Sequence, residues 1–225
     1  YIMRRGFVSL IFILLMTHVS PVATLAVEPI VGPKPQTVDD VFIPAPIDIG
    51  VENWITGLEA PWSLVFLPDG RALVSERPGR VRLIRDGQLA PEPYAVFEMT
   101  RGASGVGDFF LNLFARGEGG LMGLAVHPDF PKAPYIYAMY TWRGQSGVRN
   151  RIVRLRDHGD YGTFDKIILG GVPGALFHNG GRIAFGPDGI LYATTGEIFE
   201  RRMAQDLNAL GGKILRIDPE GNIPP

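Results

Sequence analysis

Short runs of aliphatic, β-branched and aromatic residues alternate with turn residues through most of the chain, and no sustained helical period joins them. Three runs end in the related turns Pro68-Asp69-Gly70, Pro128-Asp129-Phe130 and Pro187-Asp188-Gly189, spaced about 60 residues apart. Proline presets φ, aspartate bonds to nearby backbone and glycine accepts a positive φ, so these turns predict β-hairpins. The strands that leave the three turns are predicted at 71–75, 135–140 and 190–194.

Another apolar strand carrying basic residues follows each hairpin. These strands are predicted at 81–85, 151–156 and 213–218. Each unit is therefore a meander of about four strands, and a recurring unit of this size is typical of a β-propeller blade. The pattern predicts an all-β fold with three blades and a little more between Ile55 and Pro225, and a generic β-sandwich is the alternative.

The number of blades bears on the length of the protein. Propellers close with about four to eight blades, because each blade buries its faces against its neighbours. Three blades leave two apolar faces open, and the sequence stops soon after a predicted strand. We therefore expect an N-terminal half of a longer protein, and we expect the 225-residue chain alone to aggregate or to melt without cooperativity.

The first residues are typical of an export signal. Arg4 and Arg5 precede the apolar run 7–16, and small residues at 23–26 supply a cleavage site. The run is too short to span about 30 Å of hydrocarbon, which disfavours a transmembrane helix, and a twin-arginine signal is the alternative to the general secretory route. We predict a signal peptide at 1–26, a Pro-rich arm at 27–54 and a truncated propeller domain at 55–225. The expected location is periplasmic or secreted.

The composition of the chain excludes several classes of function. With 29 glycines, 19 prolines and 46% hydrophobic residues, the chain is turn-rich but still able to form a core. A net charge of -1 with interspersed signs argues against binding to nucleic acid. The absence of cysteine excludes disulfides, thiolate metal sites and cysteine nucleophiles. The sequence also lacks the glycine-rich and serine motifs that would support NAD, ATP or serine-hydrolase chemistry.

Three histidines follow the predicted signal peptide. His127 lies in a hairpin turn, where a structural role is favoured, and His158 lies in a polar loop typical of a solvated residue. His178 precedes Asn179, Gly180 and Gly181 at the start of a predicted first blade strand. Because such strands line the propeller channel and their loops form its mouth, His178 is the histidine that could meet a ligand.

Four linked motifs extend this picture. They are Gly117–Phe130, His178–Tyr192, Thr194–Glu197 and Gly211–Pro219. Together and in this order they resemble the soluble glucose/sorbosone dehydrogenase family of pyrroloquinoline quinone (PQQ) dependent aldose dehydrogenases. The resemblance covers about residues 55–225 and implies a six-bladed propeller with PQQ at the channel mouth and calcium beside it.

The resemblance also implies roles for single residues. His178 falls at the place of the catalytic base, which accepts the anomeric proton while hydride passes to the quinone and the aldose becomes a lactone. Glu197 stands where relatives often carry aspartate, and its carboxylate, one methylene longer, is expected to orient the imidazole and to stabilise its protonated form. Glu118 falls at a substrate- or cofactor-binding position, with capping of backbone amides as the alternative. Arg182 and Lys213 could face the anionic cofactor, although hydrogen bonds between blades are favoured.

The metal ligands, the activity of the fragment and its partners are further expectations, and two other functions are alternatives. No metal ligand is predicted within the chain, and the calcium ligands are expected beyond residue 225. The fragment alone is expected to be inactive. A non-catalytic carbohydrate- or protein-binding propeller is the main alternative, and a propeller hydrolase or lactonase is a weaker one. The expected partners are an aldose, an external electron acceptor and a possible second copy of the chain.

The segment Arg101–Arg116 interrupts the second blade. It carries several aromatic and aliphatic residues, and a lid, a dimer contact and a satellite of the core are alternative interpretations.

Overall fold

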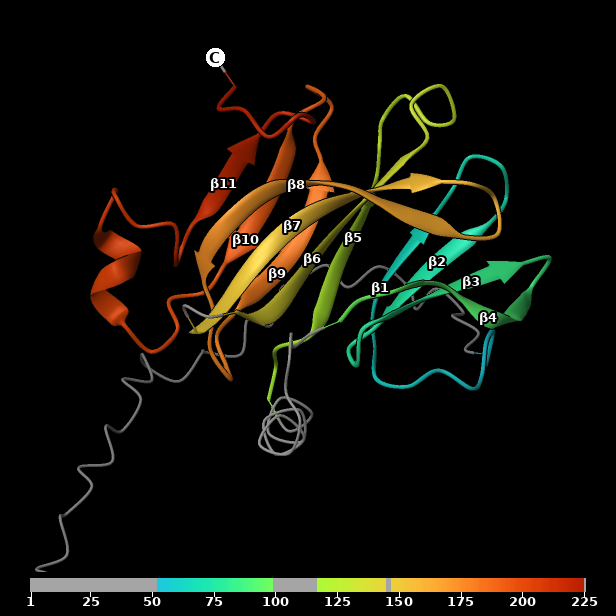
Figure 1. Cartoon of the computed structure of the whole chain (residues 1–225), viewed down its shortest axis with the longest axis horizontal. Coiled ribbons are helices and arrows are strands. Elements are labelled where there is room, and N and C mark those ends of the chain that lie inside the picture. The colour runs from blue at the N-terminus through green and yellow to red at the C-terminus, as the bar shows by residue number, and fades with distance from the viewer. Residues whose placement is uncertain (1–51, 99–116, 145–146, 225) are drawn as a thin grey trace, which may run out of the picture. The chain divides into compact units, whose positions relative to one another are not determined.

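The computed structural model describes residues 52–98, 117–144 and 147–224, and its strands form three antiparallel sheets (Figure 1). The first sheet has the order β1 (Pro61–Phe66), β2 (Ala72–Glu76), β3 (Arg80–Arg85) and β4 (Gln88–Val96). The second has the order β5 (Leu121–Val126), β6 (Tyr135–Gly144), β7 (Gly147–Asp157) and β8 (Gly162–Pro173). The third contains β9 (Gly180–Phe185), β10 (Leu191–Thr195) and β11 (Ile214–Ile217).

These sheets confirm the expected all-β meander units and place every predicted strand. The predicted signal peptide, nearly all of the Pro-rich arm and the segment 101–116 lie outside the described residues. The described part of the third sheet contains three strands rather than four. A short 3₁₀ helix, η1 (Arg201–Gln205), connects β10 to β11 and was not predicted. In the described part of the chain, no helix is long and apolar enough to cross a membrane.

The three Pro-Asp turns form hairpins as predicted. The turn amide of Gly70 donates to the Leu67 carbonyl oxygen at 3.1 Å, and that of Gly189 donates to Gly186 at 3.0 Å. Both glycines have positive φ, +90° and +73°, which is the conformation for which glycine is suited. In the middle hairpin, Phe130 N–H donates to the His127 carbonyl oxygen at 3.0 Å.

The sheets pack face to face through two apolar cores. The core between the first and second sheets includes Leu73, Val81, Leu124 and Val153. The core between the second and third includes fully buried residues such as Met139, Ile152 and Leu191. Successive side chains of a strand point to opposite faces, so β6 supplies Ala138 to the first core and Met139 to the second.

The first strands of the three sheets approach one another closely. β5 contacts both β1 and β9. Ser63 Oγ on β1 accepts a hydrogen bond from Leu124 N–H at 3.3 Å. A Cβ at Gly123 would overlap the Gly181 carbonyl oxygen of β9, so β5 needs glycine there. This close spacing brings the loops that precede β5 and β9 together.

An ion pair joins the first and second sheets. Arg71, just before β2, donates to Asp157, at the end of β7, through Nη1 at 2.9 Å and Nη2 at 2.8 Å. Tyr94 O–H donates to the same carboxylate at 2.8 Å, and Asp69 accepts from Arg71 as well. Both members of the pair have only 8% of their side chains exposed. Burial opposes ionisation of Asp157, but the Arg71 and Tyr94 hydrogen bonds outweigh it and lower the pKa of Asp157.

A second carboxylate, Glu76, is fully buried at the end of β2. It accepts hydrogen bonds from Glu59 N–H and Arg80 Nε, each at 2.7 Å, and pairs with Arg82 at 3.5 Å. Burial raises the pKa of a carboxyl, but these donors and the arginine charges outweigh it, so the pKa of Glu76 lies below its ordinary value. The carboxylate is therefore held ionised inside the sheet.

We expect the free energy of unfolding to depend on the ionisation of Glu76. Because its folded-state pKa is lowered, its contribution is complete above the ordinary Glu pKa of about 4.3 and is lost as pH falls through the lower folded value. Urea unfolding of the full-length protein at pH 7 and pH 3 measures this loss, which we expect to be smaller in Glu76→Gln than in wild type. Glu59 is an exposed carboxylate that also pairs with Arg80, so Glu59→Gln serves as the control. Equal losses in wild type and Glu76→Gln contradict the assignment.

Candidate functional site

His178 lies in the loop between β8 and β9 with its imidazole directed to a carboxylate. Its Nδ1 is 2.8 Å from Glu197 Oε1 and 3.1 Å from Glu197 Oε2. With Nδ1–H donating to the carboxylate, the neutral ring keeps its lone pair on Nε2. Within the described residues, Nε2 has no hydrogen-bond partner, and 45% of the side chain is exposed. The ring can therefore accept a proton from solvent or from a ligand.

Glu197 follows β10 and is fixed from two sides. Its Oε2 accepts the Phe199 N–H at 2.8 Å, while Oε1 faces the imidazole. The Phe199 amide is the main cause that lowers the pKa of Glu197, and the His178 hydrogen bond adds to it. The glutamate side chain, one methylene longer than aspartate, thus reaches the imidazole.

Glu118 holds the backbone of the same loop. Its Oε2 accepts the His178 N–H at 2.9 Å, and its own N–H donates to the Leu176 carbonyl oxygen at 2.8 Å. Of the two predicted roles, capping of a backbone amide is the one seen in the structure. Since Glu118 is exposed, a contact with substrate stays a prediction.

A buried amide network underlies the loop, and sequence reasoning missed it. Asn179 is 1% exposed. Its side-chain amide accepts a hydrogen bond from Ala175 N–H at 2.9 Å and donates one to the Ala175 carbonyl oxygen at 2.8 Å. Asn150, from β7, donates to Asn179 Oδ1 at 3.1 Å and to the Pro173 carbonyl oxygen at 2.7 Å. Thr141, from β6, donates to Asn150 Oδ1 at 2.7 Å. The second sheet therefore fixes the loop that carries His178, and Asn179 beside the histidine was the available signal.

Arg182 lies on β9 and contacts the first sheet rather than the imidazole. Its guanidinium carbon is 4.3 Å from the centre of the Trp62 ring, and Nη1 donates to Ser63 Oγ at 3.4 Å. This agrees with the favoured prediction of hydrogen bonds between blades. The side chain is nevertheless exposed and carries a positive charge.

Within the described part of the chain, the Lys213 ammonium makes no hydrogen bond across blades. Its ammonium donates to the carbonyl oxygens of Met203, Ala204 and Gly211 at 2.7, 3.2 and 2.9 Å. These carbonyls belong to η1 and the loop after it, so the prediction of an inter-blade bond at Lys213 was wrong. The lysine stabilises the end of a helix that the sequence pattern had not indicated.

The other two histidines have the structural roles predicted for them. His127 Nδ1 accepts the Asp129 N–H at 3.1 Å, and its ring stacks near Tyr137 and Phe185. Partial burial lowers the pKa of His127. His158 is exposed in its loop and stacks on Tyr161.

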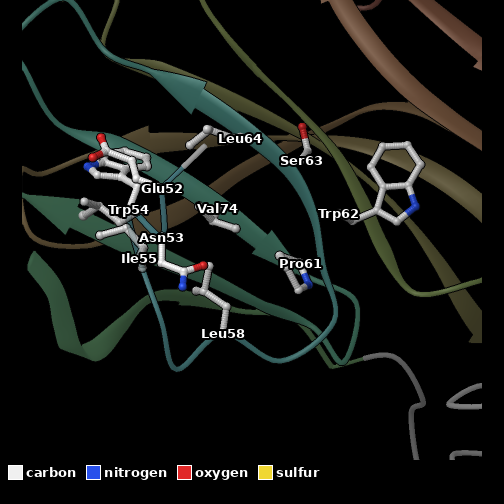
Figure 2. Close-up of a pocket in the computed structure, with 11 residues that line it drawn as sticks. Glu52, Asn53, Trp54, Ile55, Leu58, Pro61, Trp62, Ser63, Leu64 and Val74 are labelled. Carbon is white, nitrogen blue, oxygen red and sulfur yellow. The ribbon is translucent and has the colours of Figure 1, made fainter. Parts of the chain in front are cut away.

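A hollow of about 400 Å³ lies on the first sheet (Figure 2). Trp54, Leu58, Leu64 and Val74 contribute to its apolar lining. The Trp54 ring packs against Phe66, with centres 5.7 Å apart. None of the predicted site residues lines this hollow. Among the residues that the structure describes, no three histidine or acidic side chains are grouped so as to hold a metal ion.

Comparison with known proteins agrees with the fold and the motifs. The family model for glucose/sorbosone dehydrogenases matches residues 58–225. The aldose sugar dehydrogenase of Escherichia coli is 33% identical over 186 residues, which cover 80% of this chain and 47% of that protein.

Two solved structures show the same fold. A putative glucose dehydrogenase from Thermus thermophilus is 50% identical with a TM-score of 0.66, over 77% of this chain and 48% of that one. The PQQ-bound aldose sugar dehydrogenase of Streptomyces coelicolor is 35% identical with a TM-score of 0.64, over 78% and 49%. The chain thus spans about half the length of these relatives and matches about half of a six-bladed propeller. It belongs to the glucose/sorbosone dehydrogenase family.

Proposed function

We propose that the protein carrying this chain oxidises aldoses at the anomeric carbon to the lactone, with PQQ as the electron acceptor and His178 as the general base. The observation that carries this proposal is the open Nε2 of His178, whose opposite nitrogen is held by Glu197 at 2.8 Å. Kinship with PQQ-dependent aldose and glucose dehydrogenases supports it.

In this reaction the aldose loses a proton from the anomeric hydroxyl and a hydride from the anomeric carbon. PQQ, when bound, supplies the acceptor for the hydride and its two electrons. Nε2 of His178 accepts the proton, and the ring becomes a cation. Glu197 keeps the ring in the tautomer that leaves Nε2 free and stabilises the positive charge that forms. Glu118 holds the peptide N–H of His178 and so fixes the loop.

The described residues fit part of what PQQ needs. The cofactor is a planar anion with several carboxylates, and Arg182 is an exposed cation on β9 that can pair with one of them. Lys213 is less suited, because its ammonium already bonds three carbonyl oxygens. Calcium stays a prediction from the family resemblance, with its ligands expected beyond residue 225.

The remaining expectations concern the whole protein. We propose that the 225-residue chain is inactive by itself, since it spans about half of its relatives. We also propose a periplasmic or secreted location, an external electron acceptor and a possible homodimer. These rest on the sequence patterns alone.

The experiment that tests the function is aldose oxidation by the full-length protein loaded with PQQ and calcium. The panel is D-glucose, D-galactose, D-xylose and maltose, each with an artificial electron acceptor. We expect at least one aldose to be oxidised to its lactone, and no turnover of its 1,5-anhydro analogue, which lacks the anomeric hydroxyl. If PQQ binds but no aldose is oxidised, the protein is a binding propeller and the proposed function is wrong.

A further inference from the structure

Phe199 is an exposed aromatic side chain beside the candidate base. Its ring centre is 4.2 Å from that of the His178 imidazole, and the two planes differ by 28°. Phe177 packs edge-on against the Phe199 ring, and the centres of these two rings are 6.3 Å apart. Even with these neighbours, 61% of Phe199 is exposed. The ring therefore covers one face of the imidazole and leaves apolar surface open to a ligand.

The backbone that presents this ring is strained and tied to the dyad. Ile198 and Phe199 have φ values of +49° and +66°, in the left-handed region that β-branched and bulky residues rarely adopt. Such a conformation persists only where surrounding bonds enforce it. Here Phe199 N–H donates to Glu197 Oε2 at 2.8 Å and Ile198 N–H donates to the His178 carbonyl oxygen at 3.4 Å. The place of the Phe199 ring is thus set by the same groups that set the base.

A substrate of the proposed reaction has to approach this ring. A general base acts within about 2.6–3.2 Å of the oxygen whose proton it takes, so the anomeric hydroxyl must lie next to the imidazole that Phe199 covers. A pyranose has hydroxyl groups around its edge and C–H groups on its faces. The hydroxyl edge suits polar groups such as the exposed Glu118 carboxylate, whereas a C–H face suits an aromatic ring.

We propose that Phe199 forms an apolar subsite that packs against a C–H face of the aldose ring while the anomeric hydroxyl meets His178. This inference rests on the proposed function and adds to it a residue that selects cyclic sugars with an apolar face. Exposure alone does not make such a subsite, because Phe66 and Phe164 are as exposed, at 66% and 62%. The position of Phe199 beside the imidazole distinguishes it.

The test uses Phe199→Ala and Phe199→Tyr in the full-length PQQ-loaded protein, with the aldose of the panel that wild type oxidises best. We expect KM to rise about tenfold in Phe199→Ala with kcat within about twofold of wild type, because the lost contact acts on substrate binding. Calorimetric binding of the matching 1,5-anhydro sugar should weaken by a similar factor. Phe199→Tyr keeps the ring and should restore both values. Phe164→Ala removes an equally exposed ring elsewhere and should change neither.

The outcomes separate this inference from the proposed function. If wild type oxidises an aldose but Phe199→Ala keeps the wild-type KM and analogue affinity, the subsite is wrong and the function stands. A fall in kcat at unchanged KM also overturns the subsite, because it shows a ring that only positions the imidazole. If wild type oxidises no aldose of the panel, the function fails and the subsite fails with it.

Discussion

Replacing His178 by Gln should lower kcat of the full-length, PQQ-loaded protein by about 10²- to 10⁴-fold, which is the usual contribution of a positioned general base. The amide of Gln cannot accept the anomeric proton, although it preserves polarity in the loop. The backbone N–H that Glu118 holds is unchanged by the substitution. We therefore expect the folded structure and PQQ affinity to be retained, and initial rates together with PQQ titration measure both.

A matched control uses another histidine of the chain. His158 is exposed in the loop between β7 and β8, and no described contact connects it to Glu197. His158→Gln should leave kcat and KM at wild-type values. Turnover of His178→Gln at the wild-type rate with PQQ bound would remove this residue from the role of base.

The largest effect on stability should come from the ion pair between the first and second sheets. Asp157→Leu should lower the free energy of unfolding by about 3–5 kcal/mol, because breaking a buried pair leaves a charge without its partner. Arg71 would keep only the more exposed Asp69 as an acidic partner, and the Tyr94 hydroxyl would lose its acceptor. Urea unfolding of the full-length protein at pH 7 measures the change.

Two further variants separate the ion pair from other effects. The double variant Arg71→Leu, Asp157→Leu should recover part of the loss, because neither charge is then buried alone. Asp160 and Arg85 form an exposed ion pair, with 73% and 46% of their side chains exposed. Asp160→Ala breaks this pair and should lower the free energy of unfolding by about 1 kcal/mol or less. If Asp157→Leu costs no more than Asp160→Ala, the pair does not hold these sheets together.

The repeated hairpins could be predicted because local chemistry decides them. A Pro-Asp turn restricts φ and bonds to its own backbone, so the strand direction reverses there whatever packs against it. The apolar runs in the flanking strands then mark strands that are buried on both faces, as β2 and β5 are. The third strands place basic residues between apolar ones, and the exposure of these residues differs, since Arg85 and Arg216 are exposed whereas Arg154 is buried.

The sequence named the residues of the candidate site but not their geometry. His178, Glu197 and Glu118 are distant in sequence, and the motifs named them through family resemblance. The pairing of the Glu197 carboxylate with Nδ1 depends on the strained turn at Ile198 and Phe199, which no local pattern indicated. Backbone conformations enforced by neighbouring segments are not encoded in the residues that adopt them.

Long-range polar contacts were also beyond the sequence. Arg71 and Asp157 lie in separate blades, and Asn150 on β7 reaches Asn179 in the loop before β9. Each of these residues is polar within a segment whose pattern predicts a strand or a turn, so the sequence indicates neither its burial nor its partner. Lys213 illustrates the same limit, because its three acceptors belong to a 3₁₀ helix that lacks a clear helical period and to the loop after that helix.

The most direct test of the account is a single turnover measured without an external electron acceptor. Full-length wild type and His178→Gln are loaded with PQQ, mixed rapidly with the best aldose of the panel, and followed by the absorbance change of cofactor reduction. The account predicts rapid reduction in wild type and reduction at least about 10²-fold slower in His178→Gln at equal PQQ occupancy. Equal rates of reduction in the two proteins would contradict the central claim that His178 accepts the anomeric proton.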